Sequence, residues 1–209
     1  MSPTITIVRH AEARHNVEPD GDSLRDPHLT KNGEGQAKAL QTTFPHMSGI
    51  KGLISSPMRR AVQTALLGFA PAIQKGNQVV LLPELQESSA RPSDMGSPAE
   101  LLSAEFGNVI DTEFLFDGWE YKNATTTYGG RDQAKIAERT RQARVYIRSV
   151  AKTLSSDDHL VVVAHSGFIR HLIHGAPNFG NAEFRACKFI DILGEDNLAI
   201  LMEISQKTP

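Results

Sequence analysis

Three short apolar segments of the chain each end in a residue that is cationic or can become so. Residues 5–8 lead into Arg9 and His10, residues 53–58 into Arg59 and Arg60, and residues 161–164 into His165. An imidazole can attack or exchange protons, and a guanidinium presents a fork of donors to anionic oxygens. Because α/β proteins bind ligands at the carboxyl ends of their strands, we expect these three ends to meet around one phosphate.

Strands alternating with helices are predicted to position these residues. Buried strands are predicted at residues 4–8, 52–55, 79–82 and 160–164, the last being the most apolar. Two further strands, at residues 183–193 and 198–204, are predicted to pair antiparallel at one edge, with a turn at residues 194–197.

Helices are predicted after three of these strands. Thr30 is the expected N-cap of one helix, with Ala37, Leu40 and Phe44 on its inner face, and Ser56 is the expected N-cap of the next. The longest helix is expected over residues 130–154, and another begins at Ser166, directly after His165. The pattern predicts a three-layer α/β/α sandwich with a mainly parallel central sheet, antiparallel C-terminal edge strands and a cap over the site.

Residues 16–27 and 88–131 are expected to cover the site. The first is a polar, turn-prone surface loop, and in the second periodicity fades while Pro, Gly, Ser, Asp and aromatic residues accumulate. A structureless loop of that length is uncommon, so we expect a cap or lid with short helices, one near residues 98–106. We therefore expect one domain over residues 1–209 with a cap insertion at about 88–131.

Composition limits the kinds of partner. The chain has 209 residues, 40% of them hydrophobic, and a formal net charge of −2 without a long Lys/Arg run, which argues against a nucleic-acid-binding surface. The single cysteine, Cys187, excludes an intramolecular disulfide framework and is expected in the core of a late strand. No secretory signal is evident, and no stretch approaches the roughly 18 apolar residues of a membrane helix. We expect no membrane partner and a soluble, cytoplasmic protein, with nuclear localisation left open.

Five motifs in series resemble the histidine phosphatase superfamily, in its phosphoglycerate-mutase-like branch. They are Arg9-His10-Ala11-Glu12 with Asn16; Leu29-Thr30 with Gly33 and Gln36-Ala37; Ser56-Pro57-Met58-Arg59-Arg60-Ala61 with Gln63-Thr64-Ala65; Leu85-Gln86-Glu87; and Ala164-His165-Ser166-Gly167.

The resemblance implies a covalent mechanism centred on His10. His10 would attack phosphorus to form a phosphohistidine, and His165 would hydrogen-bond the transferring oxygens. Arg9 and Arg60 would bind the equatorial oxygens, where charge spreads in the transition state. Arg60 matches the family motif better than Arg59, which is expected to point elsewhere.

The resemblance also implies an acid and two further donors. Glu87 is the candidate proton donor to the leaving oxygen and the base that activates water. Asn16 matches the family's pocket asparagine, and the backbone N–H of Ser166 is a candidate donor at the start of a helix. Ala11 stands where a glycine is common, a mild departure.

Several other residues have two interpretations. His165, His171 and His174 have a spacing that metal sites use, but a phosphohistidine mechanism needs no metal, and we expect neither metal nor cofactor. Aromatic residues of the cap either line the pocket roof or only pack within the cap: Phe114, Phe116, Trp119 and Tyr121. Arg14 and His15 are assigned to the rim.

The sequence thus predicts a metal-independent hydrolase of small phosphorylated metabolites. One alternative is phosphoglycerate-mutase-type phosphoryl transfer. It is disfavoured because the cap does not closely match that of a cofactor-dependent mutase and because the chain is shorter than expected for such an enzyme. Another is a non-catalytic module that binds phosphorylated ligands, which the intact set His10, Arg60, Glu87 and His165 disfavours. An edge strand in the terminal hairpin is compatible with a homodimer.

Overall fold

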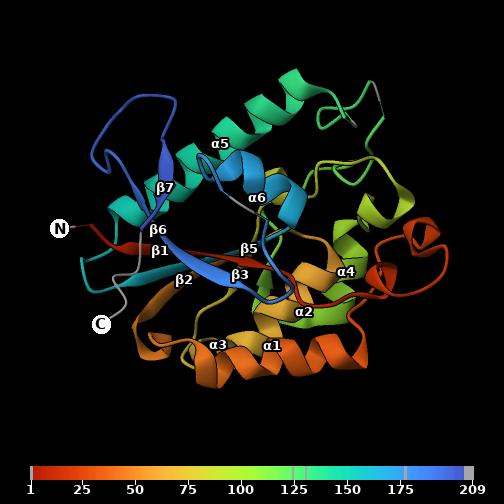
Figure 1. The fold of residues 1–209 in the computed structure, drawn as a ribbon, viewed down its shortest axis with the longest axis horizontal. Helices are drawn as coiled ribbons and strands as arrows, with labels where there is room; N and C mark the ends of the chain where they lie inside the picture. The colour runs from red at the N-terminus through yellow and green to blue at the C-terminus, as the bar shows by residue number, and fades with distance from the viewer. Residues whose placement is uncertain (1, 124, 130, 177, 205–209) are drawn as a thin grey trace.

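The computed structural model describes residues 2–123, 125–129, 131–176 and 178–204. Within these ranges the chain forms a seven-stranded mixed sheet in the order β4-β3-β2-β5-β1-β6-β7 (Figure 1). The strands are β1 (Thr4–Arg9), β2 (Ile50–Ser55), β3 (Val79–Leu81), β4 (Ile110–Asp111), β5 (His159–Ala164), β6 (Phe184–Phe189) and β7 (Leu201–Glu203). Strands β1 to β5 pair in parallel, whereas β6 is antiparallel to both β1 and β7.

Helices cover both faces of this sheet. They are α1 (Lys31–Thr43), α2 (Arg59–Gly68), α3 (Ala70–Ile73), α4 (Ala99–Phe106), α5 (Gln133–Lys152) and α6 (Ser166–Leu172). Helices α1, α2 and α3 lie on one face, and α5 and α6 lie on the other (Figure 1). The predicted α/β/α sandwich is confirmed.

The central strand β5 shows why both faces must be covered. All six of its residues are buried, with Leu160 and Val162 in one hydrophobic cluster and Val161 and Val163 in the other. A strand buried on both faces reads as a continuous apolar run, which is how this segment appears in the sequence.

Most predicted elements are present with shifted ends. Thr30 caps α1 by accepting a hydrogen bond from the Gly33 N–H at 2.9 Å. The longest helix spans Gln133–Lys152 rather than residues 130–154, and Gly130 lies outside the described residues. The antiparallel terminal strands are confirmed but shorter than predicted.

One prediction about local structure is wrong, and one segment contains an element that was not predicted. Ser56 is not an N-cap, because α2 begins at Arg59 with Met58 as its cap and the Ser56 hydroxyl pairs instead with His165. Residues 88–131 are not only a cover: besides the expected helix α4, they supply strand β4, which pairs with β3 at the sheet edge. A two-residue strand is too short to leave a periodic pattern.

Cys187 is buried in β6, as predicted, and burial raises the pKa of its thiol to about 12. In the part of the chain that the structure describes, no helix has the length and apolar character needed to cross a bilayer.

Two glycines of α1 should respond in opposite ways to a methyl group. A Cβ on buried Gly33 would lie 1.9 Å from the Glu12 carbonyl oxygen, whereas one on exposed Gly35 would meet nothing within 4 Å. Gly35→Ala should raise the free energy of unfolding by about 0.5–1 kcal/mol, because alanine is the better helix former. Gly33→Ala should lower it, because backbone must move. Urea denaturation of the two variants checks this, and equal shifts would contradict it.

Candidate active site

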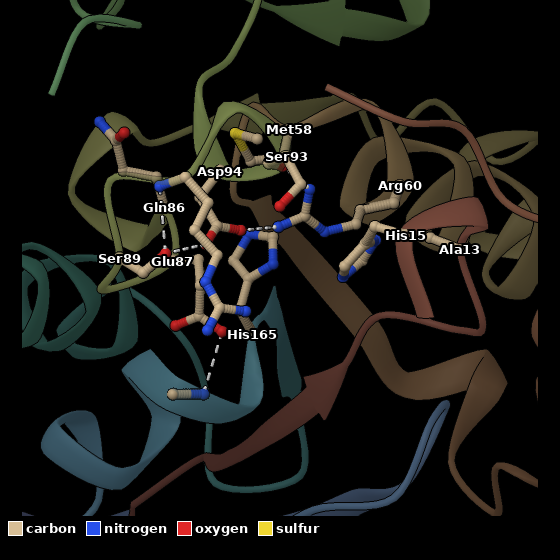
Figure 2. A network of polar contacts seen from close by, with 12 residues as sticks. Ala13, His15, Met58, Arg60, Gln86, Glu87, Ser89, Ser93, Asp94 and His165 are labelled. Carbon is tan, nitrogen blue, oxygen red and sulfur yellow. Dashed lines mark hydrogen bonds and ion pairs between the residues drawn. The ribbon is translucent and has the colours of Figure 1, made fainter. Parts of the chain in front are cut away.

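The carboxyl ends of three adjacent strands converge on one cavity. β1 lies next to β5, and β5 next to β2, so the residues that follow these strands share one edge of the sheet. The cavity has a volume of about 660 Å³. The residues that line it are Arg9, His10, His15, Asn16, Glu18, Asp20, Gly21, Asp22, Glu87, Arg91, Ser93, Asp94 and Ser166. Arg60 and His165 are fully buried beside these residues (Figure 2).

One ring nitrogen of His10 is engaged in a hydrogen bond to the backbone. Its Nδ1 lies 2.7 Å from the Ala11 carbonyl oxygen, which can only accept, so Nδ1 carries the hydrogen and Nε2 keeps a lone pair. The ring is 2% exposed, and burial together with the charge of Arg60 holds the pKa of His10 well below its usual 6.5. The imidazole is therefore neutral, with Nε2 available as a nucleophile or base.

His165 packs against His10, with ring centroids 5.0 Å apart. Its Nε2 pairs with the Ser56 hydroxyl at 2.8 Å. Burial and Arg60 also hold the pKa of His165 well below 6.5. The hydroxyl that was expected to cap a helix thus orients the second imidazole.

Arg60 is a fully buried guanidinium with two partners from the segment after β3. Its NH1 donates to the Ser93 carbonyl at 2.6 Å, and its NH2 donates to Asp94 Oδ1 at 2.8 Å (Figure 2). Arg59 points away, as predicted, toward Asp26 and Glu105. Of the two neighbouring arginines, only Arg60 raises the positive potential around His10.

Unpaired donors gather around His10. Arg9 donates through NH1 to the Phe179 carbonyl at 2.7 Å, but its Nε is buried without a partner. The same holds, among the described residues, for Arg60 Nε, His15 Nδ1 and His165 Nδ1. Buried polar groups are normally hydrogen-bonded, so this arrangement suits an anion with several acceptor oxygens.

Glu87 lines the cavity with both carboxylate oxygens held by backbone N–H groups. Its Oε1 accepts from the Ser88 N–H at 2.7 Å, and its Oε2 accepts from the Gly167 N–H at 3.1 Å. Gly167 must be glycine for this approach, because a Cβ there would lie 2.4 Å from Oε1. The carboxylate is thereby tied to the start of α6, next to His165.

Two buried cations that were not predicted hold the backbone around Glu87. Lys122 Nζ donates to the Glu87 carbonyl at 2.7 Å and the Ser89 carbonyl at 3.2 Å. Arg139 of α5 donates to the carbonyls of Glu84, at 3.1 Å, and Gln86. Burial, with a smaller contribution from Arg139, lowers the pKa of Lys122 to about 7. Arg139 could have been found from its position on the inner face of α5, but Lys122 lies in a stretch without periodicity.

The residues around the cavity mouth differ in how far they are buried and in whether they line the cavity. Asn16 lines the cavity, but its amide nitrogen donates to His15 Nε2 at 3.1 Å. Arg14 is exposed and pairs with Glu18 at the rim, as predicted. His15 was assigned to the rim with it, yet its Nδ1 is buried and its ring centroid lies 5.7 Å from that of His10.

Neither the aromatic cap residues nor His171 and His174 line this cavity. Trp119 is buried against Gly96, and none of the cap aromatics lines the cavity. Within the described ranges, no group of three or more His, Cys, Asp or Glu side chains is arranged to hold a metal ion.

Comparisons with known proteins agree with the fold. The family model for the histidine phosphatase superfamily (branch 1) matches residues 5–194, so the chain belongs to that superfamily. A probable phosphatase of Schizosaccharomyces pombe is 34% identical over 109 residues, which cover 51% of this chain and 50% of that protein. The chain thus matches about half the length of this relative.

One further relative and one solved structure of similar fold cover more of the chain at lower identity. Phosphoglycerate mutase-like protein 1 of Arabidopsis thaliana is 24% identical over 238 residues, covering 93% of this chain and 84% of that protein. The fold also resembles a mycobacterial glucosyl-3-phosphoglycerate phosphatase solved with VO3. That similarity has a TM-score of 0.62 and 19% identity, and it covers 97% of both chains.

The buried histidines should make stability depend on pH. Because the folded pKa values of His10 and His165 are lowered, the unfolded chain binds more protons below about pH 6.5. The free energy of unfolding should therefore fall as pH drops from 7 to 5, by up to about 1.4 kcal/mol per pH unit for each histidine. Urea denaturation at several pH values measures this slope. His10→Asn should make it shallower, and a flat profile in the wild type would contradict the assignment.

Proposed function

We propose that this chain hydrolyses small phosphomonoesters through a covalent phosphohistidine on His10. The observation that carries the proposal is the hydrogen bond from His10 Nδ1 to the Ala11 carbonyl, in a ring kept neutral by burial and by Arg60. This bond leaves a nucleophilic Nε2 at the centre of a group of unpaired cationic and imidazole donors. The S. pombe relative, named a probable phosphatase, supports the same class of reaction.

The first step would transfer the phosphoryl group to the enzyme. His10 Nε2 attacks phosphorus as the P–O bond to the leaving group breaks, and Glu87, in its protonated form, gives its proton to the leaving oxygen. Arg9, Arg60 and His165 would donate to the phosphoryl oxygens, whose charge is redistributed in the transition state.

The second step would release phosphate and restore the enzyme. Glu87, now a carboxylate, takes a proton from water as the water oxygen attacks phosphorus and the N–P bond breaks. The electron pair of that bond returns to Nε2, and the product is inorganic phosphate. One carboxyl group thus serves as acid and then as base.

The covalent intermediate can be trapped directly. A panel of phosphorylated metabolites with ³²P in the phosphoryl group should identify a substrate that labels the wild type, and the label should be acid-labile. His10→Ala should show neither label nor turnover, because it lacks the attacking nitrogen. Activity should survive EDTA and be inhibited by vanadate. A wild type that turns over a substrate rapidly without ever carrying label would contradict the covalent route.

The same panel separates the two alternatives. Conversion of 3-phosphoglycerate to 2-phosphoglycerate would favour the mutase reaction, and tight binding of phosphate esters without turnover would favour a binding module.

The role of Glu87 predicts matched effects at two positions. Glu87→Gln should lower kcat by roughly 10² to 10⁴, the usual share of a general acid or base. Gly167→Ala should also lower kcat, because the added methyl group displaces the Glu87 carboxylate. Gly35→Ala, which adds the same methyl group in open space, is the control and should turn over like the wild type. Full activity of Glu87→Gln on a substrate with a poor leaving group would remove Glu87 from the mechanism.

A further inference from the structure

A third imidazole, His15, borders the cavity beside His10. His15 belongs to the short 3₁₀-helix Arg14–Asn16, and its ring centroid lies 5.7 Å from that of His10. Its Nδ1 is buried and has no hydrogen-bond partner among the described residues. A buried ring nitrogen without a partner, at the wall of a cavity that already suits an anion, points to a ligand contact.

The hydrogen bonds of Asn16 determine which nitrogen of His15 carries the hydrogen. Asn16 Oδ1 accepts from the Ala13 N–H at 3.0 Å, which fixes the orientation of the amide. The amide nitrogen is therefore the atom that lies 3.1 Å from His15 Nε2, and an amide nitrogen can only donate. His15 Nε2 must accept, so in the neutral ring the hydrogen is on Nδ1.

The surroundings keep this ring neutral and in place. Burial and the charge of Arg60 lower the pKa of His15 to about 4, so the ring has one N–H near neutral pH. Gly21 packs directly on the His15 backbone, where a Cβ would lie 2.6 Å from the His15 carbonyl oxygen. The Nδ1–H is thus a donor of fixed direction.

We propose that His15 contributes a further hydrogen bond, from Nδ1–H to a phosphoryl oxygen of the substrate, and that Asn16 is the residue that positions it. This inference rests on the proposed phosphomonoesterase function and adds a donor to the phosphate site. Asn16 then acts through His15, because its own amide nitrogen is already engaged.

The wild type provides a first test that needs no substitution. Long-range ¹H–¹⁵N NMR distinguishes the two neutral tautomers of histidine, and His15 should be the Nδ1–H form near pH 7. Titration with vanadate, as a phosphoryl mimic, should shift the His15 Nδ1 resonance. An Nε2–H tautomer, or an Nδ1 resonance that does not respond to vanadate, would overturn the proposal.

Three variants at this position provide a second test, with calorimetric vanadate affinity as the readout. His15→Ala should weaken binding by about ten-fold or more, the range expected for a hydrogen bond to a charged group. His15→Asn should recover most of the lost vanadate affinity, because the asparagine amide nitrogen can occupy the place of Nδ1. His15→Gln, whose amide reaches the place of Nε2, should not. Exposed His174→Ala is the control and should bind like the wild type.

The pattern across substrates and variants separates this proposal from the function on which it rests. If vanadate binding follows the predicted series but the wild type hydrolyses no phosphomonoester, the function is wrong and the His15 contact holds. If the wild type is an active phosphatase and His15→Ala matches it in vanadate affinity and in kcat/KM, the His15 contact is wrong and the function holds. Rescue by glutamine rather than asparagine would also overturn the assignment to Nδ1.

Discussion

The buried guanidinium of Arg60 is the feature on which the rest of the site depends. Removing a charge from water costs several kcal/mol unless partners compensate, and this side chain is fully buried. The Ser93 carbonyl and the Asp94 carboxylate offset that cost. The positive charge in turn acts with burial to keep His10 and His165 unprotonated. One cation therefore both adds positive charge beside the cavity and helps to keep the two imidazoles neutral.

The segment that supplies Asp94 has little regular structure, with only two short 3₁₀ helices, Pro83–Leu85 and Pro92–Asp94. Buried backbone carbonyls need donors wherever regular structure does not provide them. Here Lys122 and Arg139 provide several of them, to carbonyls between Glu84 and Ser89. The placement of Glu87 and that of Arg60 are thus linked, since both depend on one segment held by buried cations.

Features of this structure could be predicted from the sequence where they depend on neighbouring residues, but not where they depend on contacts between residues far apart in the chain. Apolar runs bounded by turn residues are local signals, and they located β1, β5 and the ends that carry His10 and His165. The pairing of Arg60 with Asp94 joins positions 34 residues apart through a stretch without periodicity, so no local pattern indicates it. The same limit hid Lys122 and β4. The wrong N-cap has a different cause, because the Ser56 hydroxyl is of the right type for a cap but is engaged by a histidine that is distant in the sequence.

The three imidazoles of the site show how neighbouring atoms assign different tasks to one kind of side chain. Next to a carbonyl, His10 must donate from Nδ1 and keeps its lone pair on Nε2. Next to an amide nitrogen, His15 must accept at Nε2 and keeps its hydrogen on Nδ1.

His165 follows the second pattern. The Ser56 hydroxyl accepts from the Met58 N–H at 3.4 Å, and it can give its own hydrogen to His165 Nε2. The unpaired Nδ1 of His165 is then an N–H donor. The fold therefore places one imidazole with a free lone pair on Nε2 beside two imidazoles that keep a hydrogen on Nδ1. The atoms that decide this are a carbonyl, an amide and a hydroxyl rather than the histidines themselves.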